Sequence, residues 1–182
     1  QRLRTAVATL LCAIPSRTPA DRLGRALLAL QADATVDSDA VVAAAEEALR
    51  LGDHGLAERL ARGALNHGEH FGARLTLGSA LTWQGRGREA DSVLAAVELG
   101  GLSEEQLMAW ALPRAANQFW MLSEPERATT FLQNIRGRVS EASSHSTLDA
   151  LSATFSMNAG NVRRAAEVAA TGVDYLAVGA LT

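Results

Sequence analysis

Small and apolar residues recur along this chain at a spacing that places them on one side of successive helices. Four sets follow the pattern i, i+4, i+7, which forms a single stripe on an α-helix. The sets are Ala57, Ala61 and Ala64; Ala90, Leu94 and Val97; Ala128, Leu132 and Ile135; and Ala165, Ala169 and Gly172. Because one helix pair cannot bury such a stripe alone, we expect neighbouring pairs to stack and bury it together.

Proline, glycine and N-cap residues divide the sequence into about ten helices. The predicted helices span residues 2–13, 19–32, 39–51, 71–84, 87–99, 104–122, 125–136, 147–158 and 162–178, and one more runs through Ala57 to about residue 66. Ser103 and Gln106 form a capping box at the start of the 104–122 helix, and the polar segment 140–146 is predicted to be a loop. Runs of residues typical of strands are absent, so the chain should be all-α.

A turn lies five residues before the first alanine of each stripe. The four segments read Gly52-Asp-His-Gly-Leu-Ala57, Gly85-Arg-Gly-Arg-Glu-Ala90, Ser123-Glu-Pro-Glu-Arg-Ala128 and Gly160-Asn-Val-Arg-Arg-Ala165, so the alanines are 33, 38 and 37 residues apart. A helix–turn–helix unit of about 34 residues with a small residue at the helix crossing resembles the tetratricopeptide class of repeats. The resemblance implies a right-handed α-solenoid of antiparallel helix pairs. We expect about four repeats in residues 37–182, and a helical pair, linker or degenerate repeat in residues 1–36.

Two stretches are also similar to the repeat region of the large bacterial LuxR-type, maltose-activator-like transcription regulators. They read Ala43-Ala-Ala-Glu-Glu-Ala-Leu-Arg-Leu-Gly-Asp-His-Gly-Leu-Ala-Glu-Arg-Leu-Ala-Arg-Gly-Ala-Leu65 and Leu77-Gly-Ser-Ala-Leu-Thr-Trp-Gln-Gly-Arg-Gly-Arg-Glu-Ala-Asp-Ser-Val-Leu94. In that family, a signal-transduction ATPase module precedes a helical-repeat array, and a helix-turn-helix DNA-binding domain follows it. The first residue, Gln1, and the apolar end of the chain suggest a segment of a larger polypeptide. The resemblance therefore implies the middle, regulatory segment, which would bind an effector or a partner domain.

Charge and composition argue against several classes of function. All 17 basic residues are arginine, so the chain has neither a P-loop lysine nor a Schiff-base lysine. The net charge is −3 and the arginines are interspersed with acids, which argues against a nucleic-acid surface. The single cysteine, Cys12, cannot form an internal disulfide, and no apolar run approaches the roughly 20 residues that span a bilayer. We expect a cytoplasmic protein, although Arg2 and Arg4 before an apolar stretch also resemble the start of a signal peptide.

Candidate binding residues lie on the first helix of each pair, which lines the concave face of such repeats. They are Trp83, Trp110, Arg114, Asn117, Trp120, Met121, Thr154 and Asn158. One helix face is shared by Trp110, Arg114, Asn117 and Met121, because their spacing is i, i+4, i+7, i+11. Aromatic planes beside an arginine and amides suit a sugar, a nucleotide or an anionic peptide. The alternative is that the tryptophans fill the core between repeats, an interpretation that we favour for Trp83, whereas Trp110 fits the groove better.

Catalytic and metal-binding chemistry is not indicated. His67-Gly-Glu-His70 is a compact group of potential metal ligands, but its glycine and the missing third ligand favour a polar turn. No nucleophile, base and acid occur together in a recognisable motif. We therefore expect no enzyme activity, no metal and no cofactor in this segment. The expected partners are a small-molecule effector, a protein or peptide, or the ATPase and helix-turn-helix domains of the same polypeptide. A general interaction scaffold and a structural or oligomerisation spacer are the alternatives.

Overall fold

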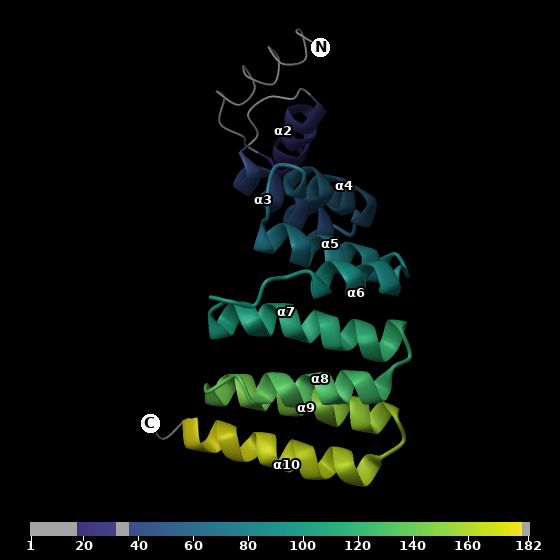
Figure 1. The fold of residues 1–182 in the computed structure, drawn as a ribbon, viewed down its shortest axis with the longest axis vertical. Coiled ribbons are helices and arrows are strands. Elements are labelled where there is room, and N and C mark those ends of the chain that lie inside the picture. Colours follow the sequence, from purple (N-terminus) through teal and green to yellow (C-terminus); the bar gives the residue numbers. More distant parts are fainter. Residues whose placement is uncertain (1–17, 32–36, 180–182) are drawn as a thin grey trace. The chain divides into compact units, whose positions relative to one another are not determined.

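The computed structural model describes residues 18–31 and 37–179, which form nine α-helices and one π-helical segment (Figure 1). Within these residues there is no strand, so the prediction of an all-α chain is confirmed. The chain divides into two compact units, Gln1–Val97 and Glu98–Thr182. The division lies beside the glycine pair Gly100-Gly101, and α2 (Pro19–Gln31) packs against α3 inside the first unit. The helix predicted at 2–13 lies outside the described residues.

The first unit stacks its helices in the order of the sequence. After α2 it contains α3 (Ser38–Arg50), α4 (His54–Leu65), α5 (Phe71–Trp83) and α6 (Gly87–Ala95). Each helix packs against the next, and α3 also touches α5, which is the pattern of a helical-repeat stack. Alanine dominates the core, and it lets the helices approach closely. At the crossing of α5 and α6, an added Cβ on Gly78 would lie 2.7 Å from the side chain of Leu94.

The second unit contains α7 (Glu104–Ala116), the π-helical segment η1 (Asn117–Met121), α8 (Pro125–Arg136), α9 (Ala142–Asn158) and α10 (Val162–Gly179). Here α9 packs against both α8 and α10, and α7 packs against α8. Larger side chains fill this core, above all Trp110, Leu132, Leu148 and Phe155. The two units therefore use different core residues for the same succession of helix pairs.

The repeated turn has two features in common at all four predicted places. Each residue five before an anchor alanine has a positive φ, namely 79° at Gly52, 77° at Gly85, 57° at Ser123 and 80° at Gly160. Each anchor alanine donates its N–H to the carbonyl four residues earlier, which is the first bond of the second helix. Ala57, Ala90 and Ala128 are fully buried, and Ala165 is 7% exposed. The predicted repeat register is confirmed by this burial.

Three local predictions were wrong. The helix α6 ends at Ala95 rather than near residue 99, because Val97 and the residues after it leave the helical path. Residues 142–146 are helical and form the first turns of α9 rather than a loop. Ala169, the second stripe residue of the last repeat, was expected to be buried but is exposed. The capping box of Ser103 and Gln106 is confirmed, with hydrogen bonds of 3.1 and 3.0 Å.

The helix that follows Ser103 contains the main irregularity. It continues through Pro113, and then η1 replaces the expected α-helix at residues 117–121. The N–H of Leu122 donates to the carbonyl of Asn117 at 3.0 Å, five residues back rather than four. The hydrogen bond that closes this turn also spans one residue more than in the other repeats. The N–H of Glu124 donates to the carbonyl of Gln118, whereas in the preceding repeat the N–H of Arg86 donates to the carbonyl of Leu81. The π turn accommodates one extra residue at the end of this helix.

Candidate functional site

The helix α8 presents a polar face around which three hollows open in the second unit. Six of its polar side chains are exposed and each lines at least one hollow: Glu126, Arg127, Thr129, Thr130, Gln133 and Asn134. The helix forms because Pro125 occupies its first turn, where a missing N–H costs nothing. Its opposite face, with Ala128, Leu132 and Ile135, is buried. The amphipathic pattern therefore holds the polar face outward.

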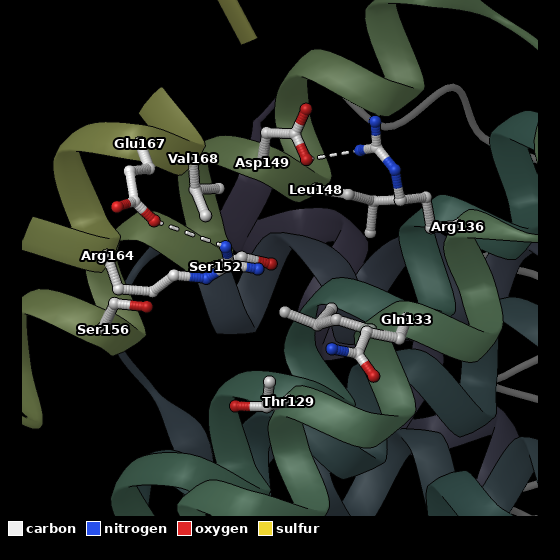
Figure 2. A pocket seen from close by; sticks show the side chains of 11 residues that line it. Thr129, Gln133, Arg136, Leu148, Asp149, Ser152, Ser156, Arg164, Glu167 and Val168 are labelled. Carbon is white, nitrogen blue, oxygen red and sulfur yellow. Dashed lines mark hydrogen bonds and ion pairs between the residues drawn. The ribbon is translucent and has the colours of Figure 1, made fainter. Parts of the chain in front are cut away.

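The first hollow has a volume of about 290 Å³ and lies between α8, α9 and α10 (Figure 2). Leu132, Leu148 and Val168 give it apolar walls, and Ser152 and Ser156 add hydroxyl groups from α9. One end is closed by an ion pair between Arg136 on α8 and Asp149 on α9. The carboxylate of Asp149 is largely buried, and its Oδ2 atom accepts no hydrogen bond in the structure.

The second hollow, of about 540 Å³, continues from the first toward the turns that precede α8 and α10. The two hollows share four lining residues, Thr129, Gln133, Ser156 and Arg164. Phe119 and Phe155 give the second hollow an aromatic wall, and their rings stack with centroids 4.2 Å apart. We call the two connected hollows the α8 groove. It combines an aromatic wall, hydroxyl and amide groups, and one arginine in the shared stretch.

The third hollow, of about 390 Å³, lies on the side of α8 that faces α7 and η1. Arg114 lines it, and of the eight predicted binding residues it alone lines one of these three hollows. The guanidinium carbon of Arg114 lies 5.2 Å from the ring centroids of both Trp110 and Phe131. This geometry is a cation–π contact with two rings, which holds the arginine against the core.

The predicted groove position of Trp110 was wrong. Trp110 is 2% exposed and packs edge-to-face on Phe131 of α8, with ring centroids 5.4 Å apart. Asn117, on the same helix face, is fully buried. The stripe of Trp110, Arg114 and Asn117 therefore faces the neighbouring helix, because burying a large aromatic surface stabilises the fold. Met121 is 40% exposed, because the π turn rotates the residues after Asn117 off that stripe.

The predicted core position of Trp83 was also wrong. Its side chain is 73% exposed and stacks on the ring of His54, with centroids 5.8 Å apart and planes at 6°. The buried residues of α5 are Ala73, Thr76, Leu77, Gly78, Ala80 and Leu81. Trp83 continues the i, i+4, i+7 spacing of Thr76 and Ala80, but it is the last residue of α5, and its exposed ring lies against His54.

The other candidates are surface groups outside the three hollows. Trp120 is 46% exposed and contacts Phe155 edge-to-face, with ring centroids 5.2 Å apart. The hydroxyl of Thr154 donates to the carbonyl of Ala150, and the amide of Asn158 donates to the carbonyl of Thr154, both at 2.8 Å. These two polar side chains therefore bond to their own helix. A binding role for Trp83, Trp120, Met121, Thr154 and Asn158 stays a prediction.

The first unit holds a dense group of ion pairs that neutralise one another. Arg86 bridges Glu58 and Glu89 at 2.7 Å each, and Arg62 adds a contact of 3.0 Å to Glu58. Burial pushes the pKa of Glu58 upward, but hydrogen bonds from Arg86 and Gln84 and the charges of the arginines outweigh burial and lower it. Two acids and two arginines are thus paired across α4 and α6. This group links helices and leaves no excess charge for a ligand.

Sequence reasoning missed the α8 groove, although one signal for it was present. Arg163 and Arg164 occupy the first turn of α10, a position where the helix dipole disfavours cations. An arginine pair at such a position is better explained by a contact outside the helix. The shape of the groove had no signal, because it is formed by side chains from three helices that only packing brings together.

Neither metal binding nor membrane spanning is supported in the part of the chain that the structure describes. No three residues among its histidines, cysteines, aspartates and glutamates cluster as metal ligands would. The turn residue His70 instead contacts Asp39 at 2.9 Å and caps α5. No helix among the described residues is both long and apolar enough to cross a bilayer.

Two solved structures share the fold of this chain. One is described as "MamA RS-1 ArsTM double mutant"; it is 16% identical, has a TM-score of 0.64, and the match covers 98% of this chain and 95% of that one. The other is YrrB, described as a TPR protein with an unusual peptide-binding site. It is 18% identical, has a TM-score of 0.62, and the match covers 94% of this chain and 84% of that one. No protein-family model and no curated protein matches the sequence. The chain has a tetratricopeptide-like helical-repeat fold.

Proposed function

We propose that this chain is a helical-repeat interaction module that binds an extended peptide segment of a partner protein in the α8 groove. The observation that carries the proposal is the continuity of the two hollows, which share Thr129, Gln133, Ser156 and Arg164. Two connected hollows form one continuous groove, which suits an extended peptide better than a compact small molecule. The hydroxyl and amide groups can bond to a peptide backbone, while Phe119, which stacks on the buried Phe155, offers an apolar contact.

The comparison with YrrB supports the same class of ligand. That protein shares the fold and is described as having a peptide-binding site. Ligand sites usually have volumes of about 300–1,000 Å³. The first hollow, of about 290 Å³, lies at the lower end of this range, and the second, of about 540 Å³, lies within it. The module needs no catalytic group, metal or cofactor for this role, because binding alone is its function. We place it in the cytoplasm, without nucleic acid or membrane as a partner.

A selection from a display library of random short peptides tests the proposal. Thr129→Trp should block the groove without changing its charge, because Thr129 lines both hollows and is exposed, so the substitution leaves the core intact. Ala150→Trp on α9 is the matched control, since Ala150 is exposed and lines neither hollow. We expect enriched peptides to lose at least about tenfold in affinity, about 1.4 kcal/mol, with Thr129→Trp only. Enrichment of no peptide, or equal binding by both variants, would refute the proposal.

The second candidate function is the regulatory segment of a LuxR-type regulator. Its support is the similarity of residues 43–65 and 77–94, which form parts of α3 and α5 and all or most of α4 and α6 in the first unit. In that case, the partner would be a small-molecule effector or another domain of the same polypeptide. The full reading frame decides this candidate. A P-loop ATPase before this segment and a helix-turn-helix domain after it are expected, and neighbouring sequence without them would refute it.

A further inference from the structure

We propose that Arg164 is the anchor of the α8 groove and that it binds a carboxylate side chain within an acidic peptide segment. This inference rests on the proposed function and names the partner chemistry of the same site. Arg164 lines both hollows and therefore stands in the stretch that they share. Figure 2 shows its side chain extending past Ser156 toward Ser152, with its ion pair to Glu167 drawn as a dashed line.

The position of Arg164 in its helix is unfavourable for stability. It lies in the first turn of α10 beside Arg163, and that turn contains no acid. The positive end of the helix dipole disfavours cations there. Asn161 already caps the helix by accepting the N–H of Arg164 at 3.1 Å. The arginine side chain is therefore not required to start the helix, and an external contact explains it better.

The charge of this pair of arginines is only partly compensated. In the described part of the chain, both pair with Glu167, at 3.8 Å from Arg163 and 3.6 Å from Arg164. Arg163, which does not line the groove, thus competes with Arg164 for one carboxylate, so the charge of Arg164 is only partly compensated. Both contacts are long and exposed, so they hold the side chains weakly. A ligand carboxylate could replace the contact to Arg164 with paired, charge-assisted hydrogen bonds.

The groove is lined by the acids Glu126, Asp149 and Glu167 and by the arginines Arg136 and Arg164, so the arginines alone can attract a carboxylate. At one end, Arg136 is committed to the buried Asp149. On the wall formed by α8, Glu126 is exposed and lines the second hollow. Glu126 would repel an acid placed against α8, so the acid should lie on the α10 side. Because the groove continues on both sides of the shared stretch, the carboxylate should belong to an internal side chain rather than to a peptide C-terminus.

The test compares two libraries of N-acetylated, C-amidated short peptides that differ at one central position. One library has Asp or Glu there and the other has Asn or Gln, so only a side-chain carboxylate distinguishes them. Affinities are measured for the unaltered protein, for Arg164→Gln and for Arg163→Gln. Arg163 is the matched control, because it has the same charge in the same turn but does not line the groove.

We expect the best acidic peptides to bind about tenfold more tightly than their amide counterparts, as a charge-assisted contact would give. Arg164→Gln should abolish this preference, and Arg163→Gln should change it less than about twofold. Glu126→Gln should strengthen acidic peptides, because it removes a like charge. Added salt should weaken them.

Three results would overturn the inference while leaving the proposed function intact. The first is peptide binding without a preference for acids, and the second is a preference that survives Arg164→Gln. The third is Arg164-dependent binding of single-stranded oligonucleotides or anionic vesicles at affinities equal to those of the acidic peptides. Failure of both libraries to bind would instead overturn the proposed function itself.

Discussion

The carboxylate of Glu104 accepts a hydrogen bond from the backbone N–H of Ser140 at 2.9 Å, across 36 residues of chain. The same carboxylate accepts the Ser140 hydroxyl and the N–H of Glu141, also at 2.9 Å each. Glu141 is the N-cap of α9, and its own side chain makes no capping hydrogen bond. A side chain in the first turn of α7 therefore caps α9 by accepting the N–H of its N-cap residue, a bond that the N3 side chain makes in a capping box.

Acid should weaken the second unit through Glu104. The backbone N–H of Ser140, aided by Ser144, Glu141 and the Ser140 hydroxyl, lowers the pKa of Glu104 from 4.5 to about 2. The unfolded chain therefore takes up this proton first as the pH falls. The contribution of Glu104 to stability is complete above about pH 4.5 and is lost as the pH falls toward 2.

Glu104→Gln is the variant that checks this contribution. It should lower the melting temperature at pH 7 and flatten the loss of stability between pH 4.5 and pH 2. Glu105→Gln is the control, because it removes the same charge from the same helix turn without touching α9. Identical pH profiles of melting temperature for the two variants would contradict the capping role.

The crossing of α5 and α6 should not tolerate a methyl group at Gly78. A Cβ there would lie 2.7 Å from Leu94, closer than carbon atoms approach without displacement. We expect Gly78→Ala to cost about 1–3 kcal/mol in the free energy of unfolding, as overpacking does. Gly55→Ala in α4 meets only one atom, at 3.8 Å, and should instead stabilise by about 0.5–1 kcal/mol. Urea denaturation of the two variants measures both effects, and the same sign for both would contradict this packing.

The anchor alanines should reject a charged side chain. Ala90 is fully buried at the crossing of α6, whereas Ala95 is exposed at the end of the same helix. Ala90→Arg combines overpacking with a buried unpaired charge and should cost about 3 kcal/mol or more. Ala95→Arg should stay within about 0.5 kcal/mol, as most surface changes do. Equal melting temperatures of the two variants would show that the repeat register is incorrect.

The three tryptophans should separate clearly in fluorescence quenching. Trp83 and Trp120 are exposed and should be quenched by iodide, whereas Trp110 should be protected. The doubly substituted Trp83→Phe, Trp120→Phe variant retains only Trp110 and isolates this signal. Trp110→Ala should cost about 3–5 kcal/mol, because it removes a buried aromatic that contacts Phe131 and Arg114. A readily quenched Trp110 would contradict its place in the core.

Local interactions explain why the fold could be predicted from the sequence. In each repeat a residue with positive φ, such as Gly52, precedes by five positions an alanine, such as Ala57, that is buried where two helices cross. Both features depend on short segments of sequence, so the spacing alone predicts them. Most helix ends followed in the same way from caps and prolines. The capping box of Ser103 needs only its own four residues, so it was predicted correctly.

Interactions between distant residues decided what the sequence did not indicate. Residues 142–146 are helical where a loop was predicted, and the cap of their helix comes from Glu104, which no local pattern connects to them. Trp110 is buried and Trp83 is exposed, the reverse of what we expected, because burial depends on which helix packs against each face. The α8 groove lies between side chains of α8, α9, α10 and η1. Its shape depends on tertiary packing, since residues far apart in sequence meet only when the helices stack.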